Sequence, residues 1–139
     1  TALLKRLGTD NVVIAGGVGA VNAKIESNLK KDFSTVTRVS GADRYATNIA
    51  VNNYVSANVG DTAMTGVWVA TGTDFPDALS AAPAAGDPTQ RLVLSNGKCI
   101  PKPVVSEWIT GADSQVEMTT LVGGVGVLPN ALMKLPECK

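Results

Sequence analysis

The 139-residue chain contains no histidine. Histidine is the commonest metal ligand and the usual general base near neutral pH, so its absence argues against both a metal centre and a catalytic site of the ordinary kind. Twelve basic residues balance twelve acidic ones, and aromatic residues make up 4% of the chain. A basic surface with interleaved aromatics, typical of nucleic-acid binding, is therefore not indicated. We expect no metal, no cofactor, no catalytic residues and no nucleic-acid partner.

The sequence also lacks an apolar run long enough to cross a membrane, so no transmembrane segment is predicted. With 45% hydrophobic and 17% charged residues, the composition is that of a globular protein, and the length suits one domain. The chain opens on an amphipathic stretch at Thr1 without a recognisable secretion signal. We interpret it as a mature or excised fragment.

Only two cysteines are present, Cys99 and Cys138. They are too few and too far apart for a zinc knuckle or a redox pair of the CxxC type. In a secreted protein the two would pair, and closing a loop of about 40 residues would stabilise the fold by roughly 4 kcal/mol. Two unpaired thiols are the alternative that the sequence leaves open.

Residues 67–86 contain an apolar run, a polar turn and a segment rich in small residues. The run at 67–70 predicts a buried strand, and the turn begins at Gly72. Asp74 is expected to cap the following helix, with Asp77 in its first turn, where a negative charge suits the helix dipole. Pro83 should kink or shorten that helix. This strand–turn–helix unit is predicted to be the centre of the fold.

Apolar runs and turn residues extend this pattern along the chain. Further strands are predicted at residues 12–15, 36–39, 91–94 and 116–122, further helices at 2–7, 22–31, 44–55, 102–110 and 129–135, and a polar loop at 56–66. Strands that alternate with helices favour a parallel sheet covered on both faces. The predicted fold class is therefore α/β, a three-layer, Rossmann-like or toprim-like arrangement of about five mostly parallel strands.

One glycine motif occurs twice. Gly-Gly-Val-Gly stands at residues 16–19 and again at 123–126, 107 positions later, each time after an apolar strand. The segments 40–45 and 71–82 have no second copy. We therefore expect residues 35–139 to form one full repeat and residues 1–34 to be the closing segment of a preceding repeat.

Three motifs together resemble the cell wall binding type 2 repeats of Gram-positive surface proteins and autolysins. They are RVSGADRYAT at residues 38–47, TGTDFPDALSAAP at 71–83, and an apolar strand ending in Gly-Gly-Val at 14–18 and 121–125. They stand in the family's order and span nearly the whole chain. The resemblance implies an extracellular, non-catalytic, S-layer-associated module.

What the resemblance implies for function is noncovalent attachment to the cell wall through an anionic polysaccharide or teichoic-type polymer. The family's repeats usually occur in threes, so other repeats of the same protein are expected partners. Linked weak sites gain greatly in overall affinity, and zero net charge fits a weak single site. Two rival functions stay open, a self-assembly module acting through repeat–repeat contacts and a nucleotide-binding α/β enzyme domain. The nucleotide fingerprint is broken, because its third glycine is replaced by Asn22.

Candidate ligand-binding residues lie where strands end. In open α/β sheets, ligands bind beyond the carboxyl ends of the strands, so the turns at 40–44, 71–77 and 123–126 are expected to share one edge. Asp74 and Asp77 are either helix-capping residues or a polar ligand contact, and catalysis by this pair lacks a partner base. Arg44 either binds phosphate or carboxylate or forms an ion pair with the 71–77 turn. The full candidate set is Arg38, Asp43, Arg44, Thr71, Asp74, Asp77, Gly123 and Gly124.

Overall fold

The computed structural model describes residues 1–58 and 63–139 and divides the chain into two compact units, Thr1–Tyr54 and Val55–Lys139. Unit 1 contains helix α1 (Ala2–Arg6), strand β1 (Asn11–Ala15), helix α2 (Ala23–Leu29) and strand β2 (Thr35–Val39). Helix α3 (Arg44–Asn58) begins in unit 1 and ends in unit 2.

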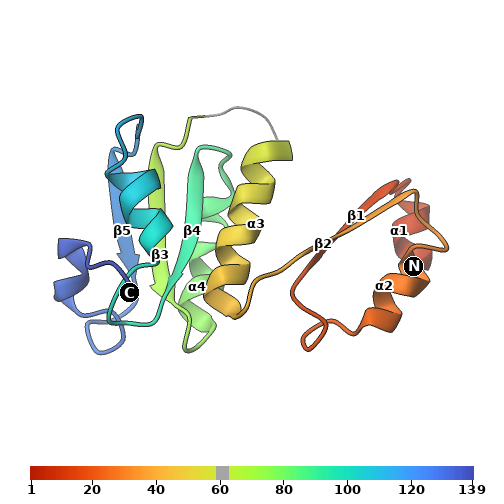
Figure 1. Cartoon of the computed structure of the whole chain (residues 1–139), viewed down its shortest axis with the longest axis horizontal. Coiled ribbons are helices and arrows are strands. Elements are labelled where there is room, and N and C mark those ends of the chain that lie inside the picture. Colours follow the sequence, from red (N-terminus) through yellow and green to blue (C-terminus); the bar gives the residue numbers. More distant parts are fainter. Residues whose placement is uncertain (59–62) are drawn as a thin grey trace. The chain divides into compact units, whose positions relative to one another are not determined.

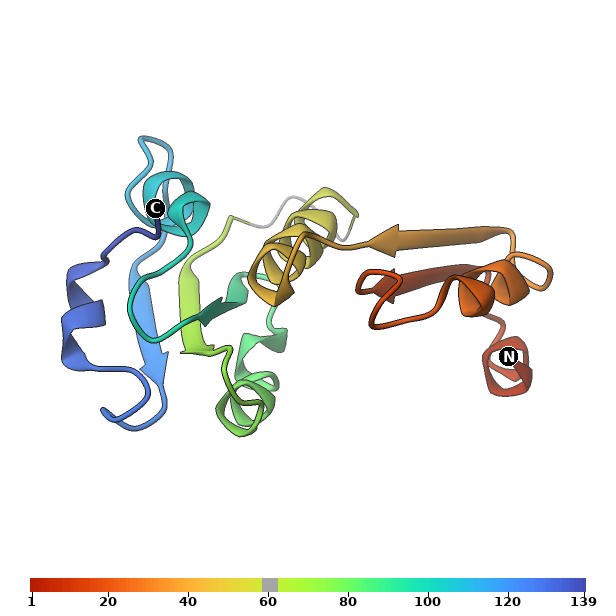
Figure 2. The same cartoon turned by 60° about the horizontal axis from the view of Figure 1, so that its bottom comes forward.

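The sheet of unit 1 has two parallel strands, β1 and β2, which lie side by side in Figures 1 and 2. Asn11 pairs with Thr35 at one end and Ala15 with Val39 at the other. α2 connects the strands, and Asn22 caps it by accepting a hydrogen bond from the backbone N–H of Lys24 at 2.8 Å. Unit 1 is thus a small β–α–β element with few buried side chains.

The sheet of unit 2 has three parallel strands in the order β4-β3-β5. The central strand β3 (Gly66–Thr71) pairs with β4 (Gln90–Ser95) on one side and with β5 (Met118–Val122) on the other. Val67, Val69 and Ala70 of β3 are fully buried. A central strand covered on both faces is expected to be continuously apolar, which explains this run.

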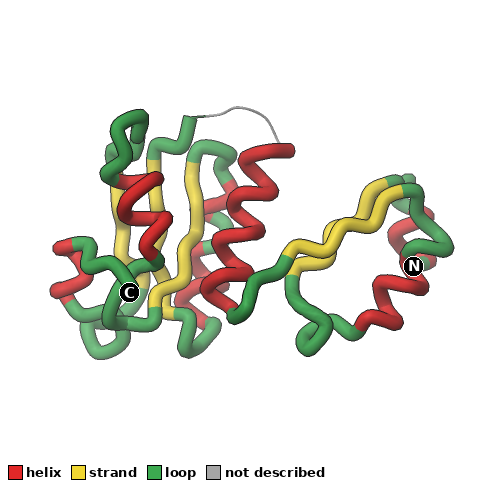
Figure 3. The backbone as a smooth tube through the Cα atoms, in the orientation of Figure 1, coloured by secondary structure: helices red, strands yellow, loops and turns green. Residues whose placement is uncertain are grey.

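Short helical segments surround this sheet. α4 (Pro76–Ala81) follows β3, the 3₁₀ turn η1 (Ala84–Gly86) precedes β4, the π-helical segment η2 (Val104–Ile109) precedes β5, and the 3₁₀ turn η3 (Asn130–Lys134) follows it. In Figures 1 and 3, η2 passes in front of the strands and α4 lies behind them. Unit 2 is therefore a three-layer arrangement, whose core includes Val93, Ile100, Val104, Leu128 and Leu132.

The predicted α/β class, the five strands and their parallel pairing are confirmed. The five strands are divided between two sheets, because β2 pairs with β1 rather than with any strand of unit 2. The helix predicted at 129–135 is a 3₁₀ turn, and the one predicted at 102–110 is mainly π-helical. Of the polar loop predicted at 56–66, residues 59–62 lie outside the described residues, α3 continues to Asn58, and β3 already begins at Gly66.

Candidate functional site

Three turns meet at the carboxyl edge of the unit 2 sheet. β3, β4 and β5 are parallel, and Ala70 pairs with Val122 near their ends. The N–H of Gly72, after β3, donates to the carbonyl of Ser95, the last residue of β4, at 2.7 Å. The turns after β3 and β5, predicted to share an edge, therefore lie together. The 40–44 turn follows β2, which belongs to the other sheet.

The turn after β3 is held by its own side chains. Thr71 is buried, and its hydroxyl lies 2.8 Å from that of Thr73. Asp74 Oδ1 accepts a hydrogen bond from the N–H of Phe75 at 2.8 Å. The predicted cap at Asp74 is therefore wrong: Phe75 occupies the N-cap position without a side-chain cap, and α4 starts at Pro76. The Asp74 carboxylate does not cap the helix because it accepts from the N–H of the next residue, Phe75, rather than from an N–H in the first turn of α4.

Asp77 and Gly123 bring the turns after β3 and β5 into contact. Asp77 lies in the first turn of α4, as predicted, and is half-buried. Gly123 has φ +138°, and a Cβ atom placed there would lie 2.6 Å from Asp77 Oδ2. Only glycine combines that backbone with so close an approach. Gly124 is exposed, and a Cβ on it would meet no heavy atom within 4 Å.

The turn after β4 belongs to the same edge, although the candidate set contains no residue from it. The buried Ser95 hydroxyl donates to the Cys99 carbonyl at 2.7 Å, and Asn96 Oδ1 accepts from the N–H of Lys98 at 2.9 Å. Lys98 is exposed and supplies a positive charge here. Asn-Gly after an apolar strand is a strong turn signal, but nothing in the sequence assigned this turn to the site. Cys99, at its end, forms a disulfide with Cys138.

Arg38 has a different environment from the one expected for a free ligand contact. Its Nε donates to Glu26 Oε2 at 2.7 Å and its Nη1 to the Gly16 carbonyl at 2.6 Å, while Nη2 is buried and has no hydrogen-bond partner among the described residues. Lys30 binds the other Glu26 oxygen at 2.6 Å. Arg38 therefore ties β2 to α2 and to the turn after β1.

Acidification is expected to weaken unit 1 through Glu26. Hydrogen bonds from Lys30 and then from Arg38 hold the pKa of Glu26 below its ordinary value of 4.5. A carboxylate with a lowered pKa in the folded state stabilises above its unfolded pKa, and that stabilisation is lost as the pH falls through the folded value. Between pH 7 and pH 3, the melting temperature of Glu26→Gln should therefore fall less than that of the wild type. Glu117→Gln, which removes an exposed carboxylate of unit 2, should follow the wild type, and equal slopes for all three chains would contradict the assignment.

Asp43 caps α3. Its Oδ1 accepts from the N–H of Ala46 at 2.8 Å, and Thr47 closes the turn by accepting from the N–H of Gly41 at 2.9 Å. Arg44 is the first residue of α3 and is exposed. The motif at residues 38–47 thus builds the start of α3 and presents Arg44 beside it.

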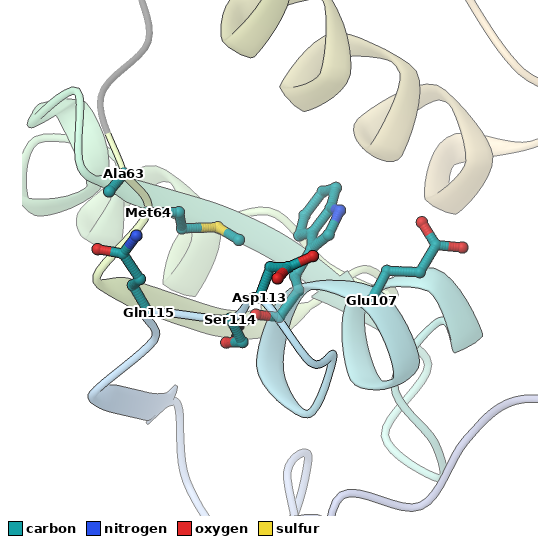
Figure 4. A pocket seen from close by; sticks show the side chains of 7 residues that line it. Ala63, Met64, Glu107, Asp113, Ser114 and Gln115 are labelled. Carbon is teal, nitrogen blue, oxygen red and sulfur yellow. Dashed lines mark hydrogen bonds between the residues drawn. The ribbon is translucent and has the colours of Figure 1, made fainter.

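A pocket lies at the opposite end of the unit 2 strands, before β3 and β5. Figure 4 shows its lining, formed by Ala63, Met64, Glu107, Trp108, Asp113, Ser114 and Gln115. None of these residues belongs to the predicted set. Within residues 1–58 and 63–139, no group of three or more acidic or cysteine side chains could hold a metal ion. No helix of this described part is long and apolar enough to span a membrane.

The chain is similar in sequence to a known family and to a known protein. A family model described as Cell wall binding domain 2 (CWB2) matches residues 38–133. The chain is also similar to N-acetylmuramoyl-L-alanine amidase LytC of Bacillus subtilis (strain 168), with 30% identity over 98 residues. The match covers 70% of this chain and 18% of LytC. The amidase activity in that name is a property of LytC, of which this chain spans less than a fifth.

Two solved structures share the fold. Cwp6 from Clostridium difficile matches with a TM-score of 0.77 and 25% identity, over 97% of this chain and 21% of Cwp6. Cwp8 from the same organism matches with a TM-score of 0.61 and 20% identity, over 89% of this chain and 19% of Cwp8. In both cases, this chain corresponds to about one fifth of the larger protein.

Proposed function

This chain belongs to the cell wall binding domain 2 family, and from that membership we propose that it holds its parent protein on the wall by binding an anionic wall polymer. The family match over residues 38–133 is the observation that carries this function. It makes the chain an extracellular, wall-associated binding domain of the type found in Gram-positive surface proteins.

We place the polymer contact at the carboxyl edge of the unit 2 sheet. Carboxylates accept hydrogen bonds from sugar hydroxyls, and Asp74 and Asp77 stand in the turn after β3. Exposed backbone at Gly124 offers close approach, and Lys98 supplies a positive charge for a phosphate or carboxylate group. The buried Thr71 holds the turn in shape.

In unit 1, Arg44 is proposed as a ligand contact in its own right, because its guanidinium suits phosphate and it stands exposed at the start of α3. Arg38 and Asp43 act as supporting residues. Their hydrogen bonds to Glu26, Gly16 and Ala46 fix the chain on either side of residues 40–42.

Co-sedimentation with purified Gram-positive cell wall tests the proposal, before and after the phosphate-linked polymers are stripped. We expect binding to be lost on stripping. Lys98→Ala, Arg44→Ala and Asp77→Asn should each bind about tenfold more weakly, the effect of losing one charge-assisted hydrogen bond. Circular dichroism checks that each variant is folded.

Lys24→Ala, Arg6→Ala and Asp113→Asn are matched controls, because they change exposed charges of the same kinds elsewhere. Asp113 lines the pocket at the opposite end of the strands. Loss of binding in Asp113→Asn with none in Asp77→Asn would move the site to that pocket. Undiminished binding to stripped wall would overturn the anionic polymer as the ligand.

A further inference from the structure

β1 and β5 are two copies of one structural element. Each is a five-residue strand, and the two strands begin at Asn11 and Met118, 107 positions apart. The turns that follow close with the same hydrogen bonds. Gly17 accepts from Ala20 and Val21 at 3.0 and 2.9 Å, and Gly124 accepts from Val127 and Leu128, both at 3.0 Å.

The two copies differ in what covers them. Behind β5, Leu128 and Leu132 are 2% and 1% exposed and belong to the core of unit 2. Their counterparts 107 positions earlier are Val21, which is half-buried, and Ile25, which is 49% exposed. The apolar residues at these two positions are therefore present in unit 1 but only partly covered. Residues 1–34 carry the inward-facing residues of a repeat without that repeat's core.

The copies also differ at their edges. β1 pairs with β2, whereas β5 pairs with β3 on one side and, within the described residues, with no strand on the other. The sequence of β5 is Met-Thr-Thr-Leu-Val, without charge or proline. Edge strands that stay unpaired are normally protected by charged residues, proline or bulges. The free edge of β5 has neither charged residues nor proline and is suited to accept another strand.

We propose that the β1–β2 pairing is the junction between successive repeats, and that β5 accepts the β2-equivalent strand of the following repeat. The occupant is parallel to β5 and follows the β1–β2 register, so Thr120 lies opposite Thr37 of the next repeat, as Val13 lies opposite Thr37 here. The Gly123 N–H then donates to the next Val39 carbonyl, as the Gly16 N–H does at 2.8 Å. Residues 1–34 play the part of β5 for the repeat that begins at β2.

The proposal commits to a β2 strand that has no β1 of its own. In a second copy of the whole chain, β1 already occupies that edge of β2. A following repeat that starts near Phe33 leaves it free. This contact concerns neighbouring repeats only, so it stands whether or not the wall polymer proposed above is the ligand.

A two-repeat chain tests the contact. Lys139 of the full chain is joined directly to Phe33 of a second copy. Thr35 of the second copy then follows Val122 of the first by as many residues as Thr35 follows Ala15 in the single chain. Thr120→Cys in the first copy and Thr37→Cys in the second are then exposed to a mild oxidant. Neighbouring strands lie about 4.8 Å apart, within disulfide range. Peptide mapping by mass spectrometry should show this new bond beside the two native ones.

Two matched cysteine pairs calibrate the rate of disulfide formation. Val13→Cys with Thr37→Cys in the single chain reports the pairing already seen, and Thr119→Cys with Thr37→Cys in the two-repeat chain places the thiols on opposite faces. We expect the Thr120 pair to react at a rate within about threefold of the Val13 pair and at least tenfold faster than the Thr119 pair. Equal rates for the Thr119 and Thr120 pairs, or no reaction of the Thr120 pair, would overturn the proposal.

Hydrogen exchange gives an independent measure of the same contact. It compares the single chain with the two-repeat chain, both without the introduced cysteines. Amides of β5 should exchange at least tenfold more slowly in the first repeat of the two-repeat chain than in the single chain. Unchanged exchange across Met118–Val122 would overturn the proposal even if a cross-link forms.

Discussion

Replacing Cys99 and Cys138 together by serine is expected to lower the free energy of unfolding of unit 2 by about 4 kcal/mol, the value for a closed loop of this length. The bond joins residues 39 positions apart and encloses η2, β5 and η3. It also fastens the last residues of the chain, where Ile100 accepts from the N–H of Cys138 at 2.9 Å. For a unit of this size, the melting temperature should fall by roughly 15–30 °C.

A reducing agent provides the control for this prediction. Reduction should destabilise the wild type as much as the double substitution does and should leave the double-serine variant unchanged. Single cysteine variants are less informative, since each leaves a reactive thiol. A difference below about 1 kcal/mol between oxidised and reduced wild type would show that the remaining contacts hold this segment without the bond.

Gly97→Ala is expected to destabilise unit 2 by about 3 kcal/mol, combining backbone strain and steric conflict. Gly97 has φ +81°, and a Cβ there would lie 2.6 Å from the carbonyl oxygen of Val127. That oxygen is part of the backbone after β5, so the conflict cannot be relieved by turning a side chain. The turn after β4 would have to move away from the turn after β5. Chemical denaturation at neutral pH measures the loss.

Gly86→Ala is the matched control for Gly97→Ala. Gly86 has no left-handed φ, and a Cβ on it would meet no heavy atom within 4 Å. Its free energy of unfolding should change by less than about 1 kcal/mol. Similar losses in both variants would mean that the Gly97 turn does not depend on contact with Val127.

Local sequence pattern was enough to find the strands but not to decide their partners. The apolar runs before Gly16, Gly72 and Gly123 predicted β1, β3 and β5 within a few residues. Which strand pairs with which depends on long-range contacts, and the short distance along the chain between β1 and β2 gave no hint of a separate sheet. The π-helical form of η2, in which Val104 and Val105 are buried, was likewise not predicted by the local pattern.

The candidate site was predictable to the same degree. Strand ends located Thr71, Asp77 and Gly123, and the structure brings the last two into contact. The hydrogen bonds of Arg38 and Asp43 were not predictable, because their partners lie in other elements or depend on where a helix begins. Lys98 was missed because the candidate set was drawn from the turns after residues 39, 70 and 122 and not from the Asn-Gly turn before Lys98.

The Cys99–Cys138 bond has a mechanical consequence for a protein that must stay attached to a wall. Tension transmitted along the backbone passes across the bond from one sulfur to the other, so the chain between them carries none of it. A stretch of 39 positions, about 130 Å when fully extended, therefore cannot be pulled straight while the disulfide is intact. Pulling on the chain would therefore load β3 and β4, which lie outside the closed loop, whereas β5 lies inside it.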